Sequence, residues 1–426
     1  MAETAQRTRT HAPKILRRRG LVVMTLLLVI GVSAYLIFAL PANQKRIAGV
    51  YLSRARALVR HDEYDQAAEA LQKASSADPD NLQIETERAK AEIFQITTKY
   101  DDLHRLMELE ALDRAEANCL RLLSANPNSA EVTALLGIVY AHKDQPARAF
   151  EMYKKASEMN PGYPNVYNYW GRTAWQWGFP ENSQEFATQK FNEAQRLDPT
   201  YPSPRTNLAV LQVLNAVTAP KDSQAQYFKS TIDNLTKIED IARNDEFFYA
   251  TWGYTLDEWG KSLLATDRIE GYKKLAAALE KYRIAGNINP DLPLVHYNRA
   301  ELLEYISPGS EQADESIAGY KKALQLQPAL AEAHEAIAKV LLKRGSDRKS
   351  LEEARDQYNQ AIDVIDKTVE QYGIRKSRTT DSHARNTLDR WTGRMLGKRS
   401  ELQKEVTALN SQLAGVSRNG DVARTK

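Results

Sequence analysis

Cysteine is almost absent from this chain of 426 residues, in which Cys119 is the single example. One cysteine cannot form an intramolecular disulfide, and it cannot supply the paired thiolates of a zinc or haem motif. A disulfide-free chain fits the cytoplasm, and it also fits a bacterial periplasmic protein with a large core. The cellular compartment must therefore be inferred from other features.

Recognisable catalytic motifs are also lacking. The seven histidines include no pair at the i, i+4 spacing of a helical zinc site and no His-Glu-x-x-His motif. The chain has no Gly-x-Ser-x-Gly elbow, no Walker phosphate loop and no Gly-x-Gly-x-x-Gly turn. We therefore predict no enzyme activity, no cofactor and no metal. One alternative stays open: His296 and His334 hold equivalent positions in successive helical units, so they could share a metal or a pH-sensitive contact.

Excess charge of either sign is small, since 58 basic and 55 acidic residues leave a net charge of +3. The balance is uneven along the chain: residues 1–20 carry +5 and residues 373–426 carry +7, which leaves −9 for residues 21–372. A nucleic-acid-binding protein would concentrate Lys and Arg on its folded body rather than at its ends. We therefore predict that the chain binds no nucleic acid.

Residues 21–40 form a long hydrophobic run that contains no charged residue. At about 1.5 Å per residue this run spans the roughly 30 Å hydrocarbon core of a bilayer, so we predict a transmembrane helix. A cleaved signal peptide and a twin-arginine signal are the alternatives, although a signal peptide normally has a shorter apolar region. Basic residues at positions 14 and 17–19 favour a cytoplasmic N-terminal tail, residues 1–20. The rest of the chain would then lie on the far side of the inner membrane, which is the periplasm if the source is a bacterium.

Beyond residue 46 the chain reads as consecutive helices separated by short turns containing Pro, Gly, Asn and Asp. The most regular stretch, residues 130–161, carries an ordered set of small, aromatic and closing residues: Leu136, Gly137, Tyr140, Ala149, Tyr153, Ala156 and Pro161. This spacing resembles the tetratricopeptide repeat, a hairpin of two helices about 34 residues long. Small residues suit the place where the helices cross, the aromatic residue fills the gap between hairpins, and proline ends the second helix.

The second-helix pattern, in which small residues flank a large one and a proline follows, recurs along the chain. Its other copies begin at Ala67, Ala115, Ala187, Ala278, Ser316 and Ala354, the last of which has no closing proline. First helices are marked by Trp170-Gly171 and Trp259-Gly260, with Ala300 and Ala338 at the equivalent small position. Uneven spacing of the closing prolines suggests a degenerate unit near residues 202–242. We predict an all-α, tetratricopeptide-like solenoid of about eight hairpins over residues 47–366.

Residues 367–416 form a basic region with an apolar stripe in which Leu388, Met395, Leu402, Leu409 and Val416 recur every seven residues. This spacing indicates a helix with one apolar face. The face could cap the last hairpin, or it could form a coiled coil with a partner or a second copy and so give a homo-oligomer. Capping is favoured because the complementary seam, which includes Thr392 and Arg399, is poorly apolar. We expect residues 417–426 to be a disordered tail.

In tetratricopeptide arrays the first helices line a concave groove that holds a peptide or a partner's helix, and the resemblance implies the same here. Carried over by repeat position, the first groove candidates are Asn165, Asn168, Arg172 and Trp175. The next candidates are Tyr254, Lys261, Tyr297 and Glu301. Amide, guanidinium and indole groups suit a peptide backbone, a carboxylate and an apolar side chain respectively. The alternative is that these residues are solvated positions on a helix face.

Together these features predict a single-pass, membrane-anchored scaffold that binds protein or peptide partners in its groove and organises an assembly of the cell envelope. Two alternatives remain. One is an adaptor of the same fold that faces the cytoplasm, and the other is an enzyme whose site is built from scattered carboxylates. The sequence does not choose among the possible envelope pathways.

Overall fold

The computed structural model describes residues 25, 28–30, 32–33, 40–59, 64–97, 109–306 and 310–424, and the regular secondary structure in these ranges is helical. The predicted tail, residues 1–20, and most of the predicted transmembrane segment, residues 21–40, lie outside the described residues. No helix within the described ranges combines the length and the apolar character that crossing a membrane requires. The chain divides into two compact units, residues 1–91 and residues 92–426.

The first unit is built on a hairpin of α2 (Leu40–Val59) and α3 (Tyr64–Ala77), followed by α4 (Leu82–Thr97), whose last residues belong to the second unit. The two hairpin helices share one core, in which Ala55 and Ala67 are both almost fully buried. Helix α4 begins beside Asn81, whose side-chain oxygen accepts a hydrogen bond from the N–H of Gln83 at 3.1 Å. This capping satisfies a backbone donor that the helix itself cannot.

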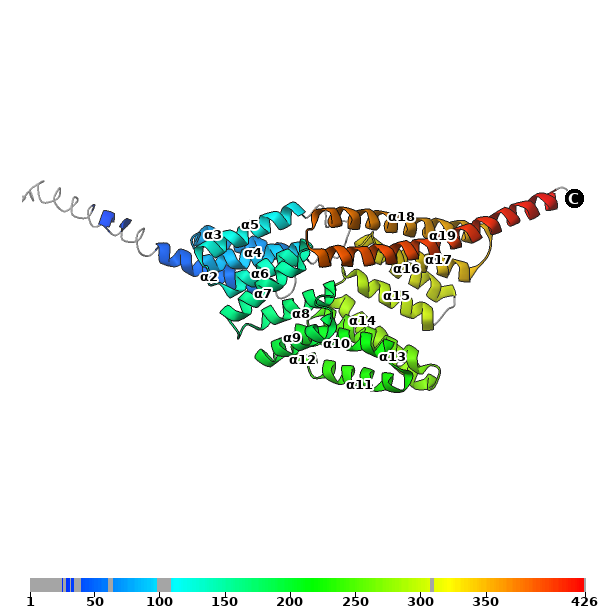
Figure 1. Cartoon of the computed structure of the whole chain (residues 1–426), viewed down its shortest axis with the longest axis horizontal. Coiled ribbons are helices and arrows are strands. Elements are labelled where there is room, and N and C mark those ends of the chain that lie inside the picture. Colours follow the sequence, from blue (N-terminus) through cyan, green and yellow to red (C-terminus); the bar gives the residue numbers. More distant parts are fainter. Residues whose placement is uncertain are drawn as a thin grey trace, which may run out of the picture. The chain divides into compact units, whose positions relative to one another are not determined.

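After the end of α4, the second unit contains α5 (Leu109–Ala125) and continues as a series of helix pairs (Figure 1). The pairs are α6 (Ala130–His142) with α7 (Pro146–Met159), α8 (Pro164–Trp177) with α9 (Ser183–Leu197), α10 (Pro202–Thr218) with α11 (Lys221–Thr236), α13 (Glu246–Leu263) with α14 (Arg268–Ile288), α15 (Pro293–Ile306) with α16 (Ser310–Leu326), and α17 (Ala331–Arg344) with α18 (Arg348–Arg378). A short helix, α12 (Glu239–Ala242), precedes α13, and α19 (Ser382–Arg424) ends the unit. Helices of a pair pack on each other, and each pair packs on the next.

Glycine allows the two helices of a hairpin to cross closely. A Cβ atom built on Gly137 of α6 would lie 2.5 Å from the ring of Tyr153 on α7, and one built on Gly171 of α8 would lie 2.7 Å from the ring of Phe191 on α9. These are the contacts that the repeat pattern predicts. In α13, however, the equivalent residue is Gly253, whose Cβ would meet Tyr282 at 2.7 Å, and not the predicted Gly260. Gly260 lies further along α13, where it approaches Leu275 and the backbone of Gly271.

The apolar stripe near the C-terminus packs against other helices of the same chain. Helices α18 and α19 lie side by side (Figure 1), and Leu402 and Leu409 are buried in a core that includes Tyr358 of α18 and Ala338 of α17. Leu402 and Leu409 therefore pack on the last hairpin, as the capping role considered above predicts. Helix α19 continues to Arg424, past the boundary expected at residue 416.

The long α18–α19 pair also reaches back to the first pairs of the second unit. Arg375, near the end of α18, forms an ion pair at 2.6 Å with Asp144, which follows α6. The ring of Trp391 on α19 lies 5.4 Å from that of Trp177, the last residue of α8. The clasp is our name for the interface between residues 375–391 and the turns that follow α6 and α8.

Candidate functional groove

The first helices of the second unit present one face away from their second helices, and this face forms the candidate groove. It is located by the small residue that meets the second helix, which is Gly171 in α8, Ala209 in α10, Gly253 in α13 and Ala300 in α15. Leu214, Glu258 and Tyr305 each lie five residues after the small residue of their helix, and Trp175 lies four residues after Gly171. We call these four residues, which occupy two adjacent positions of the repeat, the row. Trp175 and Leu214 are each 37% exposed, and Tyr305 is 49% exposed. Large apolar surface is therefore open along the row.

The predicted residues on α8 separate into two kinds. Asn168 is 2% exposed: its amide nitrogen donates to the Tyr201 hydroxyl at 2.9 Å, and its oxygen accepts from Asn207 Nδ2 at 2.9 Å. Asn165 donates to the Tyr169 hydroxyl at 3.3 Å. These amides link α8 to α10 and to their own helix instead of facing a guest with free donors.

Arg172 and Trp175 are the predicted groove residues of α8 that remain exposed. Arg172 is exposed and forms no ion pair with any residue that the structure describes. Trp175 lies three residues further along the same helix and exposes over a third of its surface. A free guanidinium beside an exposed indole can hold a carboxylate and an apolar side chain of the same guest.

The predicted residues on α13 and α15 come together around one ammonium group. Lys261 Nζ lies 3.2 Å from Asp257, 3.3 Å from Glu258 and 3.7 Å from Glu301, the last of which belongs to α15. The Tyr305 ring centroid is 5.5 Å from the same nitrogen. Three carboxylates around one cation leave this cluster with a net negative charge when all of them are ionised.

Burial and mutual attraction set the ionisation of this cluster. Burial raises the pKa of Asp257 to about 6, while the neighbouring Lys261 opposes that rise. Burial alone would lower the pKa of Lys261, but Asp257, Glu301 and Glu258 outweigh it, so the pKa of the ammonium is raised. Lys261 therefore stays charged at neutral pH. The pKa values of the Tyr254 and Tyr297 hydroxyls are also raised, by burial first and by nearby glutamates second, so both tyrosines are neutral hydrogen-bonding groups.

Sequence reasoning missed Asp257 and Glu258. The i, i+4 spacing of Asp257 and Lys261 on a helix was a usable signal for the first of them. The contact between Lys261 and Glu301 carried no such signal, because the two residues meet only when two hairpins stack.

The two histidines considered as a metal pair are each engaged separately. His296 Nε2 lies 2.7 Å from the backbone oxygen of Pro290, and His334 Nδ1 lies 2.8 Å from Gln357 Oε1. Among the residues that the structure describes, no group of histidine, cysteine and carboxylate side chains has the arrangement of a metal site.

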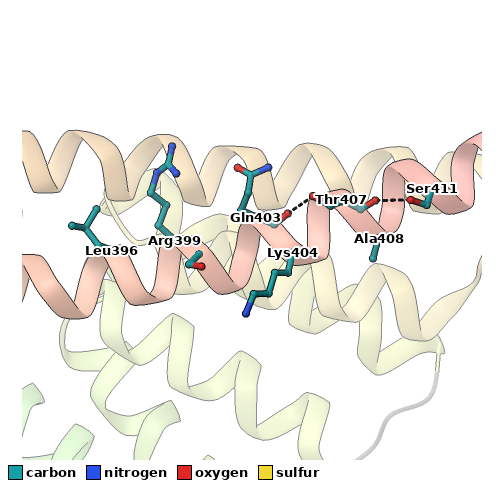
Figure 2. Close-up of a pocket in the computed structure, with 8 residues that line it drawn as sticks. Leu396, Arg399, Gln403, Lys404, Thr407, Ala408 and Ser411 are labelled. Atoms are coloured by element: carbon teal, nitrogen blue, oxygen red, sulfur yellow. Dashed lines mark hydrogen bonds between the residues drawn. The ribbon is translucent and has the colours of Figure 1, made fainter.

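A shallow hollow also lies along the outer face of α19 (Figure 2), where Leu396 is 47% exposed. Its lining residues all come from this one helix: Leu396, Arg399, Ser400, Gln403, Lys404, Thr407, Ala408 and Ser411. The Thr407 hydroxyl donates to the backbone oxygen of Gln403 at 2.8 Å, and the Ser411 hydroxyl donates to that of Thr407 at 3.1 Å. Because these hydroxyls are satisfied by their own helix and no second wall encloses the hollow, it does not resemble a small-molecule site.

Comparisons with known proteins agree with this architecture. The family model of the tetratricopeptide repeat matches residues 48–81, which include most of α2 and all of α3. No curated protein matches the chain. A solved structure of the APC/C hetero-tetramer Cut9-Hcn1 aligns with a TM-score of 0.51 and 15% identity over 80% of this chain, and this chain spans only 55% of that one.

A second solved structure, a human IFIT1 dimer with m7Gppp-AAAA, aligns with a TM-score of 0.52 and 12% identity over 89% of this chain and 94% of that chain. At these identities the likeness concerns the fold alone. With the match at residues 48–81 and the stacked hairpins of the second unit, it shows that the described part of the chain has a helical, tetratricopeptide-like repeat fold.

Proposed function

We propose that the chain is a single-pass, membrane-anchored scaffold whose groove holds protein or peptide partners of an envelope assembly. The observation that carries the binding role is the exposed row on the first helices, where Trp175, Leu214 and Tyr305 are 37%, 37% and 49% exposed. Large side chains of this kind are buried when a partner is present and contribute much of the binding energy of interfaces.

The groove also favours a particular partner chemistry. Its α8–α10 part combines apolar surface, with Val217 41% exposed beyond Leu214, and the exposed guanidinium of Arg172. Its α13–α15 part carries the negative cluster around Lys261, in which the Glu301 side chain is 46% exposed. We expect a guest segment that has apolar residues and a carboxylate at one end and a lysine or arginine at the other. A partly exposed ion pair contributes less than about 1 kcal/mol, so the apolar contacts supply most of the affinity and the charges set the direction of the guest.

Photo-crosslinking tests the groove. A benzoylphenylalanine placed at Trp175 or at Tyr305 should crosslink a partner in cells. The matched control is Tyr272 on the second helix α14, which is 43% exposed but lies off the row. Crosslinks from Tyr272 without crosslinks from the two groove positions would contradict the proposal. A Glu301→Lys variant should reduce crosslinking from Tyr305, because it reverses the charge that the guest meets.

The membrane part of the proposal rests on residues 21–40. An uncharged run of this length, with basic residues before it, favours an anchor whose N-terminus is cytoplasmic and whose repeats lie outside the cytoplasm, in the periplasm of a bacterium. A reporter fused after Lys426 that is active in only one compartment tests this placement. Reporter activity on the cytoplasmic side would identify the alternative adaptor, whose repeats face the cytoplasm. A repeat region that stays intact but no longer associates with the membrane would show that residues 21–40 are cleaved off.

A further inference from the structure

Two hairpins of the second unit hold a lysine over the face of a tryptophan. In the α8–α9 pair, Lys190 Nζ lies 4.0 Å from the ring centroid of Trp170. In the α13–α14 pair, Lys281 Nζ lies 3.5 Å from the ring centroid of Trp252. An ammonium in such a place is attracted by the negative face of the indole ring. We call these two lysine–tryptophan arrangements the Lys190 site and the Lys281 site.

The two lysines occupy the same position of the repeat. Each directly precedes the aromatic residue of the second helix whose ring meets a glycine of the first helix, which is Phe191 on Gly171 in one hairpin and Tyr282 on Gly253 in the other. Each tryptophan directly precedes that glycine and lies three residues after a tyrosine. The aligned positions of α7, α16 and α18 hold Met152, Gly319 and Gln357. The Lys190 and Lys281 sites can therefore be compared group by group.

The Lys281 site is completed by a carboxylate. Glu239 Oε1 lies 2.9 Å from Lys281 Nζ, and the Glu239 side chain is 41% exposed. Glu239 belongs to the short helix α12, which lies in the connection between α11 and α13, residues 237–245. This connection therefore brings to the lysine an acid that the hairpin itself does not contain.

The Lys190 site has no equivalent acid. Residues 160–163 join α7 to α8 without a helix of their own. In the part of the chain that the structure describes, no carboxylate forms an ion pair with Lys190. Glu193, whose charge acts on Lys190, is itself held by Arg196 through two hydrogen bonds of 2.9 and 2.7 Å. The position that Glu239 fills at Lys281 is therefore left to a group from outside the hairpin.

The other neighbours of Lys190 are aromatic. The ring centroids of Phe186 and Tyr167 lie 5.0 and 5.7 Å from its Nζ. Burial lowers the pKa of Lys190, and the charge of Glu193 only partly offsets this effect. An ammonium that has already lost part of its hydration gains more from an incoming carboxylate than a fully hydrated lysine does.

We propose that Lys190, with the rings of Tyr167, Trp170 and Phe186, is a docking point for an aspartate or glutamate side chain of a protein partner. The partner's carboxylate takes the place that Glu239 takes at Lys281. Lys190 is partly exposed, which leaves its ammonium open to a partner. The site lies on a second helix and outside the row, so it does not rest on the proposed groove.

Carbodiimide coupling in the full chain tests this docking point, because the reagent joins a lysine amine to a neighbouring carboxylate without a spacer. The probe is hexaglutamate, and mass spectrometry identifies each linked lysine. In the unmodified chain the link between Lys281 and Glu239 is the internal control for the reaction and for the folded hairpin.

Linking of Lys190 to hexaglutamate should reach a plateau as the peptide concentration rises. Linking of Lys154, an exposed lysine of α7, should stay proportional to the concentration. The plateau separates docking from the greater reactivity that a lowered pKa gives by itself, because reactivity alone does not saturate.

The variant Glu239→Gln removes the acid of the Lys281 site. Hexaglutamate should then link Lys281 as well, and this linking should reach a plateau at a peptide concentration similar to that found for Lys190. In the unmodified chain, Lys281 should link to Glu239 and not to the peptide.

Linking of Lys190 that only follows that of Lys154 would overturn the proposal. A plateau at Lys281 in Glu239→Gln, with none at Lys190, would also overturn it, because the Lys190 site would then be closed to a partner. Absence of photo-crosslinks from Trp175 in cells would refute the groove function and would leave the Lys190 docking point standing.

Discussion

Replacing Gly137 by alanine should destabilise the hairpin of α6 and α7. The added Cβ would lie 2.5 Å from Cε1 and 2.8 Å from Cδ1 of Tyr153, a fully buried ring held between hairpins. Overpacking of this kind costs roughly 1–3 kcal/mol. Alanine in place of glycine inside a helix stabilises it by about 1 kcal/mol. We therefore expect a net loss of up to about 2 kcal/mol of unfolding free energy, toward the upper end of that range because the Tyr153 ring atoms nearest the new Cβ have little room to move.

Gly393 of α19 provides the matched control, because a Cβ there would meet no atom within 4 Å. Gly393→Ala should therefore stabilise its helix by about 1 kcal/mol. Urea titrations followed by circular dichroism give the overall change. Hydrogen exchange of the α6 and α7 amides gives the local change, which is needed because repeat arrays do not always unfold in one step. If Gly137→Ala stabilises its hairpin as Gly393→Ala stabilises α19, the close crossing inferred for the repeat is wrong.

Three further predictions concern single groups. Burial raises the pKa of Asp257 from the ordinary 3.8 to about 6, so the folded state binds this proton more tightly and the unfolding free energy falls as the pH rises between these values. Urea titrations should show that Asp257→Asn lacks this fall, which is on the order of 3 kcal/mol in the unmodified chain. Burial raises the pKa of the Cys119 thiol to about 12, so a chromogenic disulfide reagent should react with it at about pH 8 only after unfolding; fast reaction in the native state would contradict this. Lys190 and Lys281 each lie over a tryptophan ring. Of these two lysines, only Lys281 forms an ion pair within the described part of the chain, with Glu239 at 2.9 Å. Burial also lowers the pKa of Lys190, so peptide mass spectrometry should find faster acylation by a succinimidyl ester at Lys190 than at Lys281, and equal rates would refute this difference.

The helical hairpins could be read from the sequence because their signals are local. A small residue at Gly137 and an aromatic residue at Tyr153 lie within one hairpin, so their contact follows from helix geometry and a short turn. The stripe of α19 is likewise visible as a spacing of seven residues, and its Leu402 and Leu409 are buried. The same local reasoning chose Gly260 as the small residue of α13, although the structure shows that it is Gly253. Two Trp-Gly pairs lie on this helix, and only the packing of Tyr282 against Gly253 distinguishes them.

The groove was only partly predictable. The exposure of Trp175 and the closeness of Tyr254 to Lys261 follow from repeat positions on a helix. Asn168 was expected to face a guest, yet it is buried because Tyr201 and Asn207 of the next pair close over it. Register along one helix gives the direction of a side chain, but what covers that side chain depends on the rotation between successive hairpins.

Sequence alone therefore determined the helices, their pairing into hairpins and the apolar faces that stack, because each of these depends on residues a few positions apart. Tertiary structure decided which groove residues are open, which carboxylates surround Lys261, and that Arg375 meets Asp144. These contacts join residues from different hairpins, and small rotations between hairpins add up along an array. No local spacing records that sum, so only the folded chain shows which distant hairpins of the second unit meet.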